Sequence, residues 1–232
     1  MTSDNAARTP RGADPYTLYL GIQFFSAACF GMMMVVASLY EAKVALLAGW
    51  QLVLVGTAVE ATILLFEIPT GVLADTYSRR LSVILGFGLM GAGFLIEGSF
   101  PLFLPILAAQ FVWGIGYTFT SGATQAWLSD EIGEARANRA FLSGNQYDIA
   151  GALTGMLLAI LLGRLSIQAP MLIGGGGLIA LAVVLAWIMA DSGFRPTPPE
   201  NRSTLQRMLR IARDGFNAAR GRPALVAVRG WA

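Results

Sequence analysis

Three carboxylates, Glu60, Glu67 and Asp148, stand inside long apolar stretches of the sequence. If those stretches cross a bilayer, a charge near the centre of one costs roughly 2.5 to 3.5 kcal/mol, so it persists where it faces a cavity, a partner or a bound proton. Glu60 and Glu67 are seven residues apart and therefore share one helix face, about 10 Å apart along the axis. We predict that Glu60 belongs to a substrate or proton site. A hydrogen-bonded packing role is the alternative for either glutamate.

A second set of side chains recurs at spacings of three and four residues in the range 110–127. Its members are Gln110, Trp113, Tyr117, Thr120, Thr124 and Trp127. This spacing places polar and aromatic groups on one helix face, which suits a cavity for an amphipathic molecule. A helix–helix interface with hydrogen bonds is the alternative. Gln146 and Asp148 are expected to join the cavity, unless Asp148 pairs with Arg136 or Arg139 instead.

The elements that position these side chains are long and uncharged. The 232 residues have a mean hydropathy of +0.61 and are 13% charged, whereas soluble domains average about a quarter. Residues 15–40, 98–129 and 165–190 contain no charge, and each range exceeds the roughly 20 residues that cross a bilayer as helix. We therefore predict an all-α polytopic membrane protein with six transmembrane helices. The expected spans are Tyr16–Tyr40, Ala48–Ala74, Leu81–Glu97, Leu102–Ser129, Ala140–Leu162 and Ala169–Ala190.

Short connectors join these spans, which makes consecutive helices antiparallel neighbours. If the amino terminus is cytoplasmic, that side receives six arginines before residue 190 and eight after it, against Lys43 and Arg164 on the other side. Since positive charge marks the cytoplasmic side, both termini are predicted to be cytoplasmic, in a cell (inner or plasma) membrane. Glu97 falls at the outer end of the third span, where we expect an exposed carboxylate.

The chain contains no His and a single Cys, Cys29. His-based catalysis, His metal sites and an intrachain disulfide are therefore excluded. Ser121 and Gly122 in the fourth span invite comparison with an intramembrane protease, but the general base that such an enzyme requires is missing. We predict a protein that is not an enzyme, with no metal and no cofactor.

The composition changes after residue 190. A polar linker rich in Pro follows, and Ser203 and Gln206 then form a capping box that opens an amphipathic helix. Such a helix lies in the membrane surface or packs on other protein. We divide the chain into a six-span bundle, residues 1–190, and a cytoplasmic Arg-rich linker, residues 191–232, which ends before a seventh span.

The connector between the second and third spans carries the sequence GVLADTYSRR. It resembles the cytoplasmic signature of the major facilitator superfamily, G-x-L-x-D-(R/K)-x-G-(R/K)-(R/K). Thr76 and Ser78 depart from this pattern. The residues that match it are Gly71, Leu73, Asp75, Arg79 and Arg80.

The resemblance implies a gate at the membrane surface. Asp75 lies near the end of its helix, where the helix dipole is unfavourable unless another group compensates it. The resemblance implies that the carboxyl-terminal half of the carrier provides this compensation. Arg79 and Arg80 are expected to pair with Asp130 at the end of the fourth span, and Glu67 to support the gate. Gly71 would allow a neighbouring helix to approach closely.

Two further patterns of the family are incomplete. In the fourth span Gly114 and Gly116 are present, but Gln110 stands where the family has an Arg. In the fifth span Gly151 and Gly155 occur without the Pro of the drug antiporters. We expect those two glycines to serve close helix packing.

The resemblance also implies a function, namely secondary transport by the rocking of two six-helix bundles. We predict export of a small molecule, with a coupling ion such as H⁺ and membrane lipid as further partners and no nucleic acid. The chain is expected to be the amino-terminal half or a truncated product of such a carrier. The alternative is a six-span protein that works as a homo- or heterodimer, or a non-transporting membrane scaffold.

Overall fold

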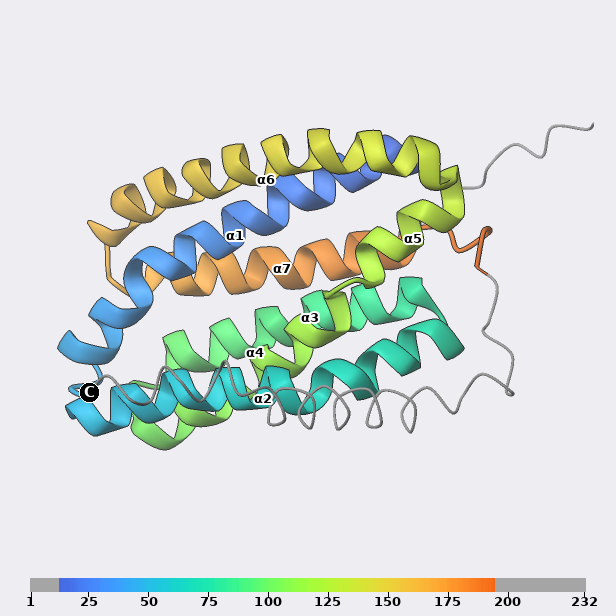
Figure 1. Ribbon diagram of the computed structural model, residues 1–232. Helices are drawn as coiled ribbons and strands as arrows, with labels where there is room; N and C mark the ends of the chain where they lie inside the picture. Colours follow the sequence, from blue (N-terminus) through green and yellow to red (C-terminus); the bar gives the residue numbers. More distant parts are fainter. Residues whose placement is uncertain (1–12, 195–232) are drawn as a thin grey trace, which may run out of the picture. The chain divides into compact units, whose positions relative to one another are not determined.

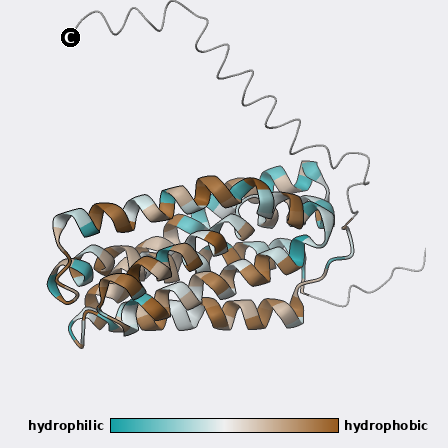
Figure 2. Ribbon diagram, turned by 90° about the horizontal axis from the view of Figure 1, so that it is seen from below, coloured by the Kyte–Doolittle hydropathy of each residue, from teal (hydrophilic) through white to brown (hydrophobic). Residues whose placement is uncertain are grey.

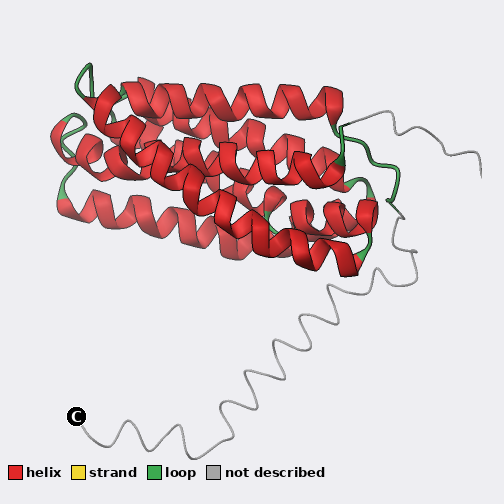
Figure 3. Cartoon of the chain, turned by 90° about the horizontal axis from the view of Figure 1, so that it is seen from above, coloured by secondary structure: helices red, strands yellow, loops and turns green. Residues whose placement is uncertain are grey.

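The structure is a computed structural model that describes residues 13–194, and within this range every regular element is a helix (Figure 3). Six stretches are long and apolar enough to cross a membrane, with α4 and α5 counted as one. The predicted six-span, all-α architecture is therefore confirmed. The amphipathic helix expected after Ser203 lies outside the described residues. The helices are α1 (Pro15–Lys43), α2 (Gly49–Thr76), α3 (Arg79–Ser99), α4 (Phe103–Thr120), α5 (Ala123–Ile132), α6 (Glu134–Gly163) and α7 (Ala169–Ile188).

Local side-chain chemistry explains where α1 begins. Asp14 precedes the helix, and its Oδ2 accepts hydrogen bonds from the backbone N–H of Thr17 at 3.0 Å and from the Thr17 hydroxyl at 2.8 Å. Pro15 occupies the first turn, where its missing N–H costs no hydrogen bond. The hydrogen bond from the Thr17 backbone, helped by the hydroxyl, lowers the pKa of the Asp14 carboxyl below its ordinary value.

The predicted fourth span, Leu102–Ser129, corresponds to the candidate span Phe103–Ile132, but this span is not one unbroken helix. The helix ends at Thr120 and restarts at Ala123, because Gly122 has a φ of +74° that is incompatible with an α-helix. Just before the break, the Thr118 and Thr120 hydroxyls donate to backbone carbonyls three residues earlier, which weakens the helical hydrogen-bond ladder. The span therefore consists of two helices joined by a bend inside the apolar region.

The helices pack as an open series in the order α6, α1, α7, α3, α4 and α2, and α1 packs most extensively on α6 (Figure 1). Glycines allow these approaches. A Cβ at Gly151 or Gly155 would collide with the backbone carbonyl of Phe24 or Ala28 in α1. The close-packing role predicted for Gly151 and Gly155 is confirmed. On α7, Gly175 lies against Gly91 of α3 in the same way.

The two ends of this series, α2 and α6, are much less covered than its middle. Only 17% of the most apolar stretch of each is buried, against 56% for α3. Figure 2 shows apolar residues along the helices and polar residues mostly near their ends. The uncovered apolar sides of α2 and α6 therefore face lipid or another protein surface.

Candidate functional site

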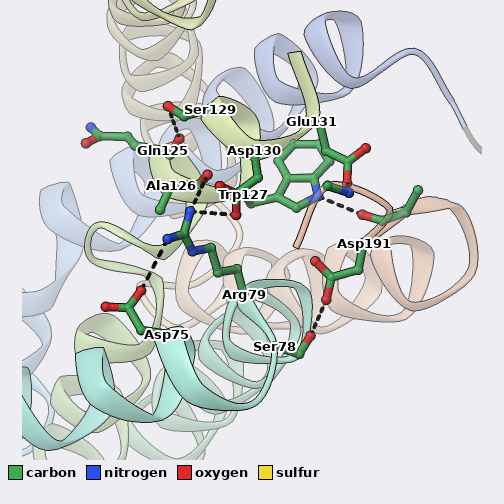
Figure 4. A network of polar contacts seen from close by, with 12 residues as sticks. Asp75, Ser78, Arg79, Gln125, Ala126, Trp127, Ser129, Asp130, Glu131 and Asp191 are labelled. Atoms are coloured by element: carbon green, nitrogen blue, oxygen red, sulfur yellow. Dashed lines mark hydrogen bonds and ion pairs between the residues drawn. The ribbon is translucent and has the colours of Figure 1, made fainter. Parts of the chain in front are cut away.

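At one end of the bundle, which we call the Ser78 end, Arg79 joins α2, α3 and α5 (Figure 4). Its Nη1 lies 2.6 Å from Asp130 Oδ2 and also donates to the Ala126 carbonyl at 2.8 Å. Its Nη2 lies 3.4 Å from Oδ1 of Asp75, which precedes it by four residues in the last turn of α2. The arginine is thus the centre of the charged residues in the GVLADTYSRR connector.

The segment after α7 is tied to the same end. The Ser78 hydroxyl donates to Asp191 Oδ2 at 2.6 Å, and its oxygen accepts from the backbone N–H of Leu81, so Ser78 also caps α3. Trp127 Nε1 donates to the Ala190 carbonyl at 2.7 Å (Figure 4). Ser78 has a φ of −175°, an extended conformation that needs no glycine. These bonds hold α3, α5 and the end of α7 together.

Gly71 has open space around it within the described residues, because a Cβ there would meet no atom within 4 Å. Two expectations for this end are wrong within the described residues. Arg80 does not pair with Asp130 but donates to the Ala186 carbonyl of α7. Trp127 does not line a cavity, since it is 1% exposed and packs in the core. Leu73 is 42% exposed, on the same poorly covered helix as Gly71.

Further along the bundle lies a cavity of about 460 Å³, which we call the Asp148 cavity. It is bounded by α1, α3, α6 and the bend between α4 and α5, and Tyr117 forms part of its wall. Asp148 makes no ion pair among residues 13–194, so the alternative pairing with Arg136 or Arg139 does not occur in this structure. The other polar side chains of the lining are Gln23, Ser26, Thr120, Ser121, Thr124 and Gln125.

A second cavity, of about 360 Å³, lies among α1, α2, α3 and α4, and we call it the Glu97 cavity. Glu60 and Gln110 line it, together with Glu41 and Glu97. Gln110 Nε2 donates to Glu97 Oε2 at 2.8 Å, which joins α3 to α4. No three or more His, Cys, Asp or Glu residues of the described range are grouped as metal ligands.

Stacked aromatic rings separate the two cavities. The Trp113 ring stacks on Tyr117 with centroids 5.7 Å apart and on Phe94 with centroids 6.4 Å apart, while Phe30 meets Trp113 edge-on at 5.8 Å. Trp113 and Phe94 line the Glu97 cavity, whereas Tyr117 and Phe30 line the Asp148 cavity. Met34 lines both, so the cavities adjoin. The predicted stripe of the fourth span therefore lines two cavities rather than one.

Two predicted site residues lie elsewhere. Gln146 is exposed and is absent from the lining of the Asp148 cavity, so its expected place there is wrong. Glu67 is exposed on α2 and lines neither cavity.

The expectation that Glu97 is an exposed end-of-span carboxylate is also wrong, because only 2% of this residue is exposed. A sequence signal for its burial exists: Glu97 continues the buried stripe of α3 at alternating spacings of four and three. The earlier members of that stripe are Val83, Phe87, Met90 and Phe94.

Comparison with known proteins agrees with this arrangement. The sequence profile of the Major Facilitator Superfamily matches residues 19–232, more than half of the chain. The chain belongs to the Major Facilitator Superfamily. It is also 28% identical over 127 residues to the uncharacterized MFS-type transporter YxaM of Bacillus subtilis (strain 168). That match covers 53% of this chain and 31% of the relative, so the chain spans about a third of that protein's length.

Family membership and the six stretches long and apolar enough to cross a membrane indicate that this chain is a multi-pass membrane protein. The family indicates a non-enzymatic carrier of small molecules. The two adjoining cavities are where the described residues offer space for such a molecule.

Proposed function

We propose that the bundle is one half of a secondary transporter that exports a small solute across the cell membrane by alternating access. The observation that carries the proposal is the pair of adjoining cavities, which share α1 as a wall and which the poorly covered helices α6 and α2 each help to line. A second bundle placed against α2 and α6 would enclose both cavities. Rocking of one bundle on the other would then expose a bound solute to each side in turn.

The distribution of positive charge supports the orientation in this proposal. Arg79 and Arg80 lie at the Ser78 end, and Arg136 and Arg139 follow the connector at Gly133 at the same end. Lys43 lies at the opposite end, as does Arg164. By the positive-inside rule the Ser78 end would face the cytoplasm, which would place both termini there.

We propose that the Arg79 network acts as the gate at this end. Arg79 connects Asp75 of α2 to Asp130 of α5, and Ser78 connects α3 to Asp191. Because the side chain of Asp75 is 55% exposed, a second bundle could reach its carboxylate. Gly71 and Leu73 lie on the same exposed part of α2 and would be part of that contact. Opening would break charged contacts at this end and thereby couple bundle motion to access.

The test compares cells that express residues 1–232 with cells that express the complete open reading frame. Efflux of labelled phenethylamine, lactose and citrate is measured from right-side-out and inverted vesicles. We expect outward flux of at least one probe by the complete protein, little flux by residues 1–232, and a loss of tenfold or more in Asp75→Asn. Glu134→Gln, an exposed carboxylate at the same end, is the matched control and should keep normal flux.

Robust, probe-dependent flux by residues 1–232 alone would overturn the half-carrier proposal and favour a functional dimer of this chain. Normal flux in Asp75→Asn would overturn the gate. If neither the complete protein nor residues 1–232 transported any of the probes, the scaffold alternative would be favoured.

A further inference from the structure

The Glu97 cavity contains an excess of hydrogen-bond acceptors. Glu97 Oε2 accepts from Gln110, but Glu97 Oε1 is buried and has no hydrogen-bond partner within residues 13–194. Glu41 and Glu60 add two more carboxyl groups to the lining, which contains no Lys and no Arg. The Glu41 carboxyl lies within interaction range of Glu97.

Such an arrangement is costly while the cavity is empty. A buried acceptor without a donor costs about 1–3 kcal/mol, and more when the group is charged. Neighbouring carboxylates repel one another, and this repulsion is stronger away from water. Gln110 is neutral and gives Glu97 one N–H, so it compensates neither the second oxygen nor the charge. A ligand group that carries positive charge and donates a hydrogen bond would compensate both.

Apart from Ser38, the rest of the lining is apolar or aromatic. Met33 and Phe94 form part of the wall, and the Trp113 ring lies between the two cavities. Trp113 Nε1, a donor, is buried without a hydrogen-bond partner among the described residues. Aromatic faces attract cations, and this attraction grows when the cation is desolvated.

We infer that the Glu97 cavity binds a small organic cation with at least one N–H, such as a protonated amine, attached to an apolar or aromatic body. The N–H donates to Glu97 Oε1, Glu41 and Glu60 balance the charge, and the body packs against Trp113 and Phe94. A volume of about 360 Å³ suits a molecule of this size. The inference names the substrate class of the proposed carrier and in that sense rests on the proposed function.

A cation with an N–H should bind differently from a cation without one and from a neutral donor. A quaternary ammonium carries the same charge but has no N–H, so it leaves Glu97 Oε1 without a donor. A neutral alcohol of the same shape donates a hydrogen bond but brings no charge. Since charge-assisted hydrogen bonds are roughly twice as strong as neutral ones, only the amine satisfies both requirements.

The experiment measures binding by isothermal titration calorimetry to the full 232-residue chain in lipid nanodiscs. Its probes are phenethylamine, phenethyltrimethylammonium and 2-phenylethanol, which share one phenethyl body. We expect phenethylamine to bind at least tenfold more tightly than either analogue. Glu97→Gln should weaken phenethylamine binding at least tenfold and reduce the difference between the three probes.

Two controls keep the result interpretable. Glu134→Gln removes an exposed carboxylate at the other end and should leave binding unchanged, while circular dichroism verifies the fold of each variant. Glu41→Gln provides a second variant with an expected loss of three- to tenfold, should Glu97→Gln fail to fold. Equal binding of the amine and the quaternary probe, undiminished binding in both variants, or no binding of phenethylamine would each overturn the inference.

Failure here is distinguishable from failure of the proposed function. Efflux of lactose or citrate by the complete protein, without phenethylamine binding, would leave the carrier intact and remove the amine assignment. Selective phenethylamine binding without any flux would leave the cavity assignment intact and remove the transport proposal.

Discussion

The two ends of the bundle treat their charged side chains in opposite ways. At the Ser78 end, Arg79 meets two aspartates and a carbonyl, and Asp191 meets a hydroxyl. In the Glu97 cavity the lining carboxyl groups face no cation, and Glu97 Oε1 has no donor among the described residues. The comparison indicates that the ion pairs of Arg79 hold helices together at one end, whereas the carboxyl groups at the other end remain available to a ligand.

The physical basis of this contrast is desolvation. Moving a charge out of water is costly, and an opposite charge with good geometry offsets most of that cost. Where the cost is not offset within the protein, a ligand that supplies the opposite charge gains affinity from it. Matched changes at the two ends should therefore affect stability differently.

Arg79→Gln should give the largest loss of stability. The change leaves the partly buried Asp130 without its cation and removes the donor to the Ala126 carbonyl. We expect the free energy of unfolding to fall by about 2 kcal/mol, less than for a fully buried pair because the Asp130 side chain is 26% exposed. Unfolding in mixed detergent–SDS micelles measures this. Arg164→Gln, at an exposed arginine of the opposite end, should change it by less than about 0.5 kcal/mol.

Glu97→Gln should act in the opposite direction. The amide replaces a buried carboxyl group that has no cation beside it, and the amide oxygen can still accept from Gln110. We expect the free energy of unfolding without ligand to be unchanged or higher by up to about 1 kcal/mol. Asp130→Asn is the matched change at the Ser78 end and should lower the free energy of unfolding. Equal losses in these two variants would contradict the comparison.

The two tryptophans provide a smaller test with neutral groups. Trp127→Phe removes the hydrogen bond from Nε1 to the Ala190 carbonyl and should lower the free energy of unfolding by about 1 kcal/mol. Trp113→Phe removes an N–H that has no hydrogen-bond partner among the described residues. Apart from the effect of burying a smaller ring, this change should lower the free energy of unfolding by less than about 0.5 kcal/mol. Thermal unfolding followed by circular dichroism ranks the two. The reverse order would argue that Trp113 Nε1 is already satisfied.

Asp14, at the Ser78 end, should show the smallest effect. Because the hydrogen bonds from Thr17 lower the pKa of its carboxyl in the folded state, its contribution is fully present above the ordinary value of 3.8 and is lost as the pH falls through the lower folded value. Wild-type protein should therefore lose slightly more stability than Asp14→Asn between pH 5 and about pH 2, by less than about 0.5 kcal/mol. Unfolding curves across this range, with Thr17→Val as a second way to remove the bonds, test the sign.

Much of the architecture was predictable from local chemistry. Uncharged stretches longer than a bilayer is thick predict spans, because an apolar helix in lipid satisfies its own backbone hydrogen bonds. Glycines at a spacing of four, Gly151 and Gly155, predicted a close helix contact, which α1 and α6 make. The motif in residues 71–80 identified the family, and its Arg79 lies beside Asp130 as expected.

The candidate site was less predictable for two reasons. Some of its residues are distant in the sequence, and the position of others depends on a local bend in a helix. The bend at Gly122 divides the stripe of the fourth span between two cavities and turns Trp127 into the core. Arg80 reaches Ala186, 106 residues away, instead of the predicted Asp130. No periodicity within one helix carries information about which neighbour a side chain meets.

The number of spans, the helical class and the family could therefore be inferred from composition and from residue spacing along the chain. The burial of Glu97 against Gln110, and the cavity that it shares with Glu41 and Glu60, became visible once the helices were placed in three dimensions. The physical reason is that the partners of a buried carboxylate determine its free energy and what it can bind. Those partners come from separate helices, whose rotation about their axes is set by packing.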